Sequence, residues 1–361
     1  MKRFSVSASL LAGAVVAAGM AAGPLPASAA DGVADFYKGK QIRMVIGYSA
    51  GGGYDIYARL LAKHMAKHIP GNPTIVPQNM DGAGSRVAAN WLYNIAPKDG
   101  TAIGIVAQST PADQVLNPDG VQFDAAKYNW IGNPIVDNNL MFTLKESGYE
   151  TIEDVKRKGG LVCGGTGASS PSITQPLMLN NMLDTKIKII AGYPGGNDVN
   201  LAVERGEVNC RGSNSWASTV ATLGKWMENK RLQILVQFGV TADPAISVYQ
   251  GRKVPTILDI ATSEEDRKAV NLMVSGVAMG RPFLAPPGLP EERIAALRKA
   301  FDETMKDREF IEECKKGKLD LNPLSGIDLQ RIAADTVNTS PAIVKRSQEL
   351  LKQESIEEIK K

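Results

Sequence analysis

Three glycine-rich segments stand where a predicted strand is followed by a predicted helix. They span residues 47–55, 164–172 and 192–198. At such a turn the first N–H groups of the helix lack backbone partners, the helix dipole favours negative charge, and glycine lets a ligand approach the backbone. Each segment is therefore a candidate anion-binding site, although ordinary strand-to-helix turns have the same composition. Three together favour a ligand cleft, because open α/β sheets bind ligands at the carboxyl ends of their strands.

Polar side chains in and after these turns add to the candidate site. The hydroxyl groups that can donate to a carboxylate are those of Ser49, Thr166, Ser169 and Ser170. Asp55 and Asp198 are placed to cap their helices. Gln108 and Ser109 follow a third predicted strand and could face the same cleft.

The segment 209–216 offers a second kind of ligand contact. It follows a short predicted strand and carries a cation, an amide and an indole, those of Arg211, Asn214 and Trp216. These groups could recognise a second acidic or planar group of a ligand. Alternatively, Trp216 belongs to the core and Arg211 to the solvated surface.

Residues 47–51 also match the G-x-S-x-G nucleophile elbow of α/β-hydrolases, with Ser49 as the nucleophile. That mechanism needs a histidine base. The chain contains only His64 and His68, and both lie on the helix that directly follows Ser49, so neither could return to it. We therefore predict that the protein is not an enzyme, and keep a serine hydrolase as the alternative of a different class.

His64 and His68 are spaced i,i+4, which would allow both imidazoles to bind one metal ion. No nearby Cys, Asp or Glu completes a ligand set in the sequence, and Lys63 and Lys67 add positive charge. We predict no metal site and interpret both histidines as polar residues suited to the end of a helix. The sequence lacks the glycine motifs of nucleotide-binding loops, so we expect no cofactor.

The composition is that of a large globular protein. Of 361 residues, 43% are hydrophobic and 22% are charged, and this length favours two domains. The 41 basic and 38 acidic residues leave a formal net charge of +3, and no dense basic cluster could neutralise a run of phosphates. We expect no nucleic-acid partner.

Residues 1–30 have the pattern of a secretory signal peptide. Basic residues at positions 2 and 3 precede a short apolar run, and residues 27–29, Ala-Ser-Ala, form a cleavage site. The apolar run is too short for a membrane anchor, and no cysteine before Cys163 could carry a lipid. We expect a soluble periplasmic protein.

The chain has three cysteines, which are few for an oxidising compartment and cannot all pair. Cys163 and Cys210 each end a short strand-like run, so they could meet on neighbouring strands and form a disulfide. The alternative is that each is a small core residue.

Strands alternate with amphipathic helices along the chain, which indicates an α/β fold whose mainly parallel sheets are covered by helices. The predicted strands include 41–46, 74–77, 101–106, 140–144, 186–190, 232–237 and 273–279. The predicted helices include 55–68, 85–94, 151–158, 172–183, 198–205, 218–230 and 290–306. We predict a discontinuous domain 1 (31–132 and 238–361) and a domain 2 (133–237). Two extended crossings join them as a hinge around an interdomain cleft.

Several motifs, in this order, resemble those of the extracytoplasmic solute receptors of tripartite tricarboxylate transporters, the Bug family. The matching segments are 42–59 with its Gly51-Gly52-Gly53-Tyr54-Asp55 and Ala58-Arg59, 79–85, 96–101, Gly165-Thr166-Gly167, Tyr193-Pro194-Gly195-Gly196, 205–208, 254–256 and 284–290. The resemblance covers residues 36–328. It implies a type II periplasmic-binding-protein fold and a small organic acid held by backbone N–H groups, hydroxyls and water. It also implies a membrane permease as the partner.

The resemblance and the turns together define the candidate ligand-binding residues. They are Ser49, Gly51, Gly52, Gly53, Tyr54, Asp55, Gln108, Ser109, Thr166, Gly167, Ser169, Ser170, Tyr193, Gly195, Gly196, Asn197, Arg211 and Asn214. Tyr54, Arg211, Asn214 and Trp216 depart from the commoner family pattern. These departures leave open whether the ligand is a di- or tricarboxylate, an aromatic acid or a neutral molecule.

We therefore expect a monomeric periplasmic receptor that captures a small carboxylate in its cleft and delivers it to a membrane permease. A ligand sensor with a signalling protein as its partner is the non-catalytic alternative.

Overall fold

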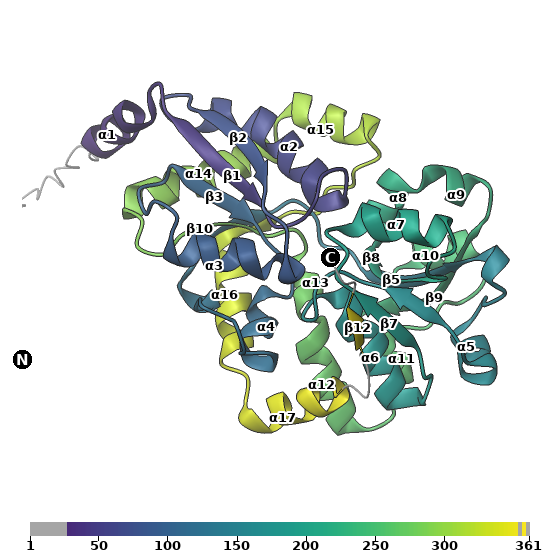
Figure 1. Ribbon diagram of the computed structural model, residues 1–361. Helices are drawn as coiled ribbons and strands as arrows, with labels where there is room; N and C mark the ends of the chain where they lie inside the picture. The colour runs from purple at the N-terminus through teal and green to yellow at the C-terminus, as the bar shows by residue number, and fades with distance from the viewer. Residues whose placement is uncertain (1–26, 353–355, 359–361) are drawn as a thin grey trace, which may run out of the picture.

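The computed structural model describes residues 27–352 and 356–358 of the chain. Residues 1–26 of the predicted signal peptide lie outside this range, and its predicted cleavage site falls within helix α1 (Ala27–Tyr37). Two sheets, each surrounded by helices, lie side by side (Figure 1). We call the first sheet with its helices the first lobe, and the second sheet with its helices the second lobe.

The first sheet has the strand order β11-β4-β10-β3-β1-β2. Its strands are β1 (Gln41–Ile46), β2 (Thr74–Asn79), β3 (Ala102–Ile105), β4 (Asn129–Asn133), β10 (Phe283–Ala285) and β11 (Leu324–Ser325). β1 pairs in parallel with β2 and β3, whereas β10 runs antiparallel to β3 and β4. The parallel part confirms the β-α-β-α-β opening predicted from the sequence.

The second sheet has the order β12-β7-β6-β8-β5-β9. Its strands are β5 (Asn139–Leu144), β6 (Val162–Gly164), β7 (Lys188–Ala191), β8 (Cys210–Ser215), β9 (Leu232–Phe238) and β12 (Ile356–Glu358). β6 pairs in parallel with β7 and β8, and β5 is antiparallel to β8 and β9. Both sheets are therefore mixed, and the predicted α/β fold class is confirmed.

Helices cover both sheets. The first lobe carries α2 (Gly53–Met65), α3 (Arg86–Asn94), α4 (Thr110–Leu116), α14 (Glu291–Thr304), α15 (Arg308–Lys316) and α16 (Gly326–Val337). In α2 the side chains of Tyr57, Leu61 and Met65 recur every fourth residue and are all buried. Each such burial contributes about 1.5–3 kcal/mol, which is why this periodicity predicts the helix correctly.

The second lobe contains more of the chain than the sequence predicts. Its helices are α5 (Ile152–Lys158), α6 (Pro171–Leu183), α7 (Gly196–Glu204), α8 (Trp216–Thr222), α9 (Gly224–Glu228), α10 (Pro244–Gln250), α11 (Ile257–Ile260), α12 (Glu264–Val274), α13 (Gly276–Met279) and α17 (Pro341–Leu350). Ile257, Val270 and Val274 share one apolar core with Cys163 and Cys210 of the second sheet. The predicted return to domain 1 at residue 238 is therefore wrong, because the chain rejoins the first sheet only at β10.

Residues 273–279, predicted as a strand, are helical. Ser263 begins α12 by accepting a hydrogen bond from the Asp266 N–H, and three acidic residues occupy the first turn of that helix. This start signal favours α12, which ends at Val274, and a separate short helix, α13, follows Ser275. The predicted helix 218–230 is also divided, into α8 and α9 at Leu223.

The C-terminal segment returns to the second lobe. α17 packs against α12, where Arg346 makes two hydrogen bonds to Asp266 Oδ1 at 2.9 and 2.7 Å. β12 then extends the second sheet beside β7. These contacts place the end of the described chain with the second sheet, whereas the sequence predicts domain 1 up to residue 361.

A disulfide joins Cys163 of β6 to Cys210 of β8. The two residues are direct partners in the parallel register, with their Cα atoms 4.2 Å apart. The sequence left open either a disulfide or two small core residues, and the structure has the disulfide between neighbouring strands. Cys314 is the remaining cysteine, and it is free and buried.

We predict that the double substitution Cys163→Ala/Cys210→Ala lowers the free energy of unfolding by about 2–4 kcal/mol, because the unfolded chain then regains the entropy of an open loop. Urea denaturation with and without reductant tests this. Reductant should destabilise the wild type and leave the variant unchanged. Equal denaturation midpoints for the oxidised wild type and the variant would contradict the prediction.

Candidate functional site

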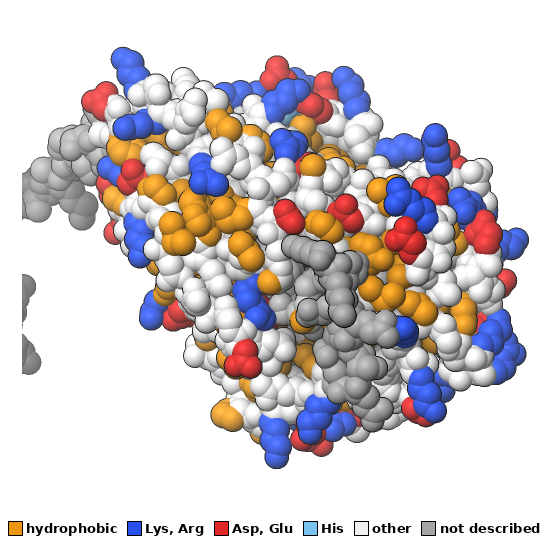
Figure 2. All heavy atoms as spheres, in the orientation of Figure 1, with side chains coloured by type: hydrophobic (Ala, Val, Ile, Leu, Met, Phe, Trp, Pro, Cys, Tyr) orange, Lys and Arg blue, Asp and Glu red, His pale blue; other side chains and the backbone are white. Residues whose placement is uncertain are grey.

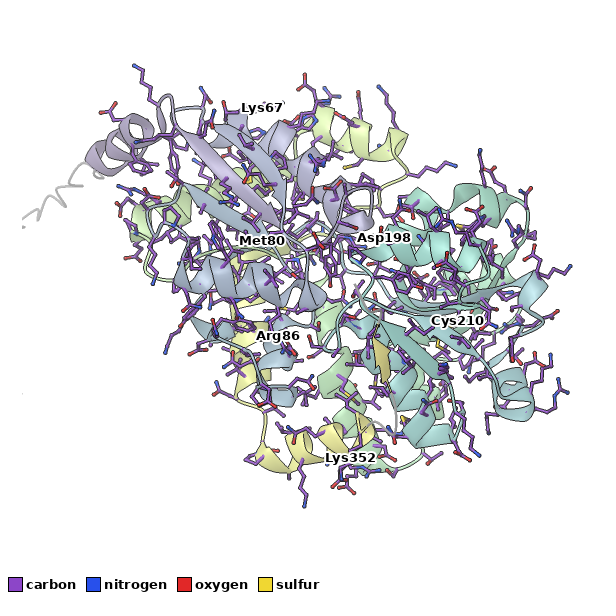
Figure 3. The ribbon with its side chains drawn as sticks, viewed as in Figure 1. Lys67, Met80, Arg86, Asp198, Cys210 and Lys352 are labelled. Carbon is purple, nitrogen blue, oxygen red and sulfur yellow. A yellow bond between two sulfur atoms is a disulfide. The ribbon has the colours of Figure 1, made fainter. Side chains whose placement is uncertain are left out.

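A pocket lies between the two lobes, at the ends of strands from both sheets. Tyr48, Gly52, Gly53, Tyr54 and Gln108 line it from the first lobe. The second lobe contributes Asn139, Thr166, Ser170, Pro171, Ser172, Gly196, Arg211, Ser213, Asn214, Ser215 and Ser218, and the return crossing contributes Arg281. Figure 3 shows side chains from both lobes converging in the region between the labelled residues Met80 and Asp198. Among the described residues, the pocket lining contains two arginines, Arg211 and Arg281, and no acidic residue.

The turn before α2 is held by Asp55, which is buried behind the pocket. Its carboxylate accepts hydrogen bonds from the Gly51 N–H at 3.0 Å, from Arg59 and from Asn79. Burial alone would raise the pKa of Asp55, but these hydrogen bonds lower it below its ordinary value. Asp55 therefore shapes the turn, while the uncapped start of α2 at Gly52 faces the pocket.

The turn before α6 brings hydroxyl groups to the opposite wall. Ser172 Oγ accepts a hydrogen bond from the Thr166 N–H at 3.0 Å and lies 2.7 Å from Ser170 Oγ. No side chain caps α6, whose N-cap residue is Ser170. This wall therefore offers hydroxyls and the positive end of a helix dipole.

The turn before α7 meets the first lobe directly. Ser49 Oγ donates a hydrogen bond of 2.7 Å to Asp198 Oδ2 across the gap between the lobes. A Cβ atom built on Gly195 would lie 2.1 Å from Ser49 Oγ, so only glycine fits there without displacement. Ser49 and Gly195 therefore join the lobes and do not line the pocket.

Arg211 has an unusual environment. It is the second residue of β8, its side chain is 5% exposed, and it lines the pocket. Its Nε and Nη1 atoms have no hydrogen-bond partner among the described residues. Burial lowers the pKa of Arg211 to about 10, because the surroundings disfavour its charged form.

Arg281 is the second cation of the pocket, and its side chain makes several contacts. Its guanidinium carbon lies 4.6 Å from the centre of the Tyr54 ring, and Nη2 donates to the hydroxyls of Ser215 and Ser218. Sequence reasoning missed Arg281, because residues 273–279 read as a strand and nothing local linked the arginine to the cleft. Its only signal is a lone cation after an apolar run.

The pocket gathers part of the predicted set. Predicted residues that line it are Gly52, Gly53, Tyr54, Gln108, Thr166, Ser170, Gly196, Arg211 and Asn214. Predicted residues outside the lining are Ser49, Gly51, Asp55, Ser109, Gly167, Ser169, Tyr193, Gly195 and Asn197. Lining residues that the sequence analysis missed are Tyr48, Asn139, Pro171, Ser172, Ser213, Ser215, Ser218 and Arg281. Several of the missed residues are serines in β8 and α8, whose polar pattern resembles ordinary helix capping.

In segment 209–216, one residue lies in the core and another lines the pocket. Trp216 is buried in the apolar core of the second lobe, as the alternative interpretation has it. Arg211 is buried in the pocket and does not lie on the solvated surface. Asn214 also lines the pocket and donates from Nδ2 to Thr219 Oγ1 at 3.0 Å.

Both histidines lie away from Ser49, against acidic residues that the sequence analysis did not connect with them. His64 Nε2 is 2.8 Å from Glu313 Oε2, and His68 Nε2 is 3.0 Å from Asp307 Oδ2. Acidic residues that are distant in the sequence thus lie beside both histidines, because α15 packs against α2. Lys63 and Lys67 form ion pairs with these same acidic side chains, which opposes a cation there.

Surface charge and helix length give two further observations. Basic and acidic side chains are interspersed over the face in view (Figure 2). Within the described residues, no helix is both long enough and apolar enough to cross a membrane.

The chain is similar to known proteins over nearly its full length. No protein-family model matches it. The UPF0065 protein in gbd 5′ region of Cupriavidus necator is 26% identical over 368 residues, covering 96% of this chain and 97% of that protein. The structure of the periplasmic binding protein BugD superposes with a TM-score of 0.68 at 17% identity, covering 90% of this chain and all of BugD. MatC of Rhodopseudomonas palustris with bound malate gives 0.66 at 18% identity, covering 87% of this chain and 99% of that chain.

At these identities the structural matches show the fold, which is that of periplasmic binding proteins. The resemblance to Bug-type receptors, inferred from the motifs, is confirmed by these comparisons.

We predict that Gly167→Ala separates the lobes without unfolding them. A Cβ atom at this position would lie 2.1 Å from Gly84 N and 2.3 Å from Ala83 C, both of them backbone atoms of the first lobe. Small-angle scattering should give a larger radius of gyration, while the free energy of unfolding stays within about 1 kcal/mol of the wild type. Gly52→Ala is the control, because its Cβ would lie 3.9 Å from the nearest atom across the gap. An unchanged radius in Gly167→Ala would contradict the prediction.

Proposed function

We propose that this chain, Bug-type in fold and in full-length similarity, is a periplasmic solute receptor that captures a small carboxylate between its lobes. We further propose that it delivers the carboxylate to a tripartite tricarboxylate-type permease. The observation that carries the proposal is the buried guanidinium of Arg211, which has unpartnered donors in a pocket lined by no acidic residue. Buried donors without hydrogen-bond partners are costly, so an anionic ligand that accepts from them would relieve that cost.

Three helix starts support the same ligand chemistry. α2, α6 and α7 begin beside the pocket at Gly52, Ser170 and Gly195, and none of them has a side-chain cap. Their first-turn N–H groups and dipoles favour negative charge. The carboxylate would therefore meet hydrogen-bond donors from both lobes.

A ligand that binds between the lobes distinguishes two states of the receptor, open and closed. Contacts such as Ser49 with Asp198 form only when the lobes are close together. A ligand that touches both lobes binds the closed form more tightly and shifts the population toward it. A permease could then distinguish loaded from empty receptor by shape.

The remaining parts of the proposal rest on sequence and likeness. The pattern of residues 1–30 supports export to the periplasm. Malate in the MatC structure supports a carboxylate ligand, and the periplasmic binding protein BugD among the compared structures supports a non-enzymatic role. Ser49 hydrogen-bonds to Asp198 rather than to a histidine, so the geometry gives a hydrolase no support.

A thermal-shift screen of the mature protein tests the function. The panel contains aliphatic and aromatic mono-, di- and tricarboxylates, with amides and sugars as neutral controls. A ligand at about 100 times its Kd should stabilise the folded state by about 2.7 kcal/mol and raise Tm accordingly. Shifts from neutral compounds alone would contradict a carboxylate receptor.

The pH dependence of binding gives a second test. A ligand carboxylate is ionised above about pH 5, whereas the pKa of Arg211 is lowered to about 10 by burial. Affinity should therefore be nearly constant between these limits. It should fall at lower pH as the ligand takes up a proton, and above pH 10 as Arg211 loses one. Isothermal titration calorimetry across this range measures it, and affinity that rises below pH 5 would contradict the ion pair.

A further inference from the structure

Arg281 lies where the chain returns from the second lobe to the first. It stands between α13 and β10, and the residue is 3% exposed. Its backbone N–H donates a hydrogen bond of 2.8 Å to Asn133 Oδ1, and the same oxygen accepts one of 3.0 Å from the Ile135 N–H. Asn133 ends β4, so the outgoing crossing to β5 begins there. Arg281 is therefore held at the point where the outgoing and return crossings meet.

The preceding residue, Gly280, shows how closely the two crossings pack. Its φ of +56° lies in the left-handed region, and a Cβ atom built there would lie 1.9 Å from the carbonyl oxygen of Ile135. Only glycine fits this position without displacement. The backbone at Arg281 is thus packed against the outgoing crossing, while its side chain extends toward both lobes.

The side chain of Arg281 contacts both lobes at once. On the first lobe, its guanidinium carbon lies 4.6 Å from the ring centre of Tyr54 and 5.5 Å from that of Tyr57, both in α2. On the second lobe, Nη2 donates to the hydroxyls of Ser215, the N-cap residue of α8, and of Ser218 in its first turn. A hinge motion that moves α2 away from α8 separates these two sets of contacts.

α2 and α8 are also in direct contact beside this arginine. A Cβ atom built on Gly53, the first residue of α2, would lie 1.8 Å from Ser218 Oγ and 3.0 Å from Arg281 Nη2. The guanidinium therefore lies at a close junction of the two lobes. Its contacts with both helices exist together only while this junction is closed.

One donor of Arg281 remains for a ligand. Nε is buried and has no hydrogen-bond partner among the described residues, whereas Nη2 is used by the two serines. Arg281 lines the pocket, as do Tyr54 and both serines. A ligand carboxylate that accepts from Nε would add a charge-assisted hydrogen bond to a guanidinium that both lobes already orient.

Arg211 has a different position relative to the lobes. It belongs to β8 of the second sheet, where the preceding residue, Cys210, is joined by a disulfide to Cys163 of β6. A Cβ atom built on Gly196 of α7 would lie 2.8 Å from Arg211 Nη2, so the guanidinium packs against its own lobe. Arg211 therefore moves with the second lobe and keeps these neighbours when the lobes separate.

We propose, on the basis of the proposed function, that Arg281 couples ligand binding to closure: the ligand accepts from its Nε in the closed form, where the guanidinium joins α2 to α8. Arg211 contributes affinity in both forms, whereas Arg281 contributes the difference in affinity between them. Only such a difference shifts an equilibrium between two states, however tightly the ligand binds overall. The assignment therefore predicts a variant that still binds ligand but does not close.

Paired measurements of affinity and closure test this assignment. The probe is whichever of malate, adipate and terephthalate binds the wild type most tightly by titration calorimetry. Small-angle scattering then gives the radius of gyration with and without saturating probe. The wild type should contract on binding, because the closed form binds the probe more tightly.

Two arginine variants should separate the two properties. Arg281→Met should weaken binding by about tenfold or more, since a hydrogen bond to a charged group is lost, and should not contract at saturating probe. Arg211→Met should weaken binding by about 30-fold or more, and should still contract at saturation. Arg331→Met removes an exposed ion pair with Asp328 and is the matched control, with unchanged affinity and unchanged contraction.

A second variant keeps the test valid if Arg281→Met does not fold. Ser218→Ala removes one acceptor of Arg281 in the second lobe and leaves the arginine and the ligand donor Nε in place. It should reduce the contraction at saturating probe more than it reduces affinity. Thermal unfolding of each unliganded variant confirms that the protein is folded.

Each outcome supports or overturns the assignment. Full contraction by Arg281→Met at saturating probe overturns it, and so does a wild type that binds the probe without contracting. Loss of contraction in Arg211→Met as well would show that closure needs both cations, which overturns the division of roles. These results leave the carboxylate receptor standing. If neither the probes nor the wider panel binds the wild type, the proposed function itself fails.

Discussion

The pocket depends on one unfavourable interaction, the burial of the Arg211 guanidinium, two of whose nitrogen atoms have no hydrogen-bond partner in the part of the chain that the structure describes. A cation removed from water is tolerated only when charge or hydrogen bonds replace its hydration. Here the surrounding groups are neutral amides, hydroxyls and tyrosine rings, with acids held behind the walls by other partners. The unliganded site is therefore less stable electrostatically than a site completed by an anion. This difference is the physical basis of the proposed ligand binding.

The fold maintains this arrangement through rigid neighbours. Arg211 directly follows Cys210, whose disulfide to Cys163 joins β8 to β6 beneath the pocket. Arg281 lies on the return crossing and touches α2 of one lobe and α8 of the other. Contacts between the lobes are made at close-packed glycines such as Gly167 and Gly195, which leave no space for a Cβ atom. Strand register, crossing and glycine contacts together bring donors from both lobes to one place.

The pocket combines turns that match the family motifs with two arginines that lie outside those motifs. The turns before α2, α6 and α7 correspond to the motifs that indicated a Bug-type receptor, and the compared structures share the fold. The two buried arginines stand at positions that no matching motif contains. Side chains outside the family motifs thus line the pocket, together with the motif residues Gly52, Gly53, Thr166 and Gly196.

The sequence by itself determined the local structure, because its signals are local. Apolar spacing predicted α2, glycine-rich turns predicted strand ends that the structure places at a pocket, and two strand-terminal cysteines suggested a bridge that the structure contains. Tertiary structure alone decided that residues 244–279 pack on the second sheet, that Asp55 accepts hydrogen bonds that hold the turn before α2, and that Arg281 lines the pocket. The reason is physical: periodicity and capping act within a few residues, whereas burial and charge pairing depend on which distant segments the fold brings into contact.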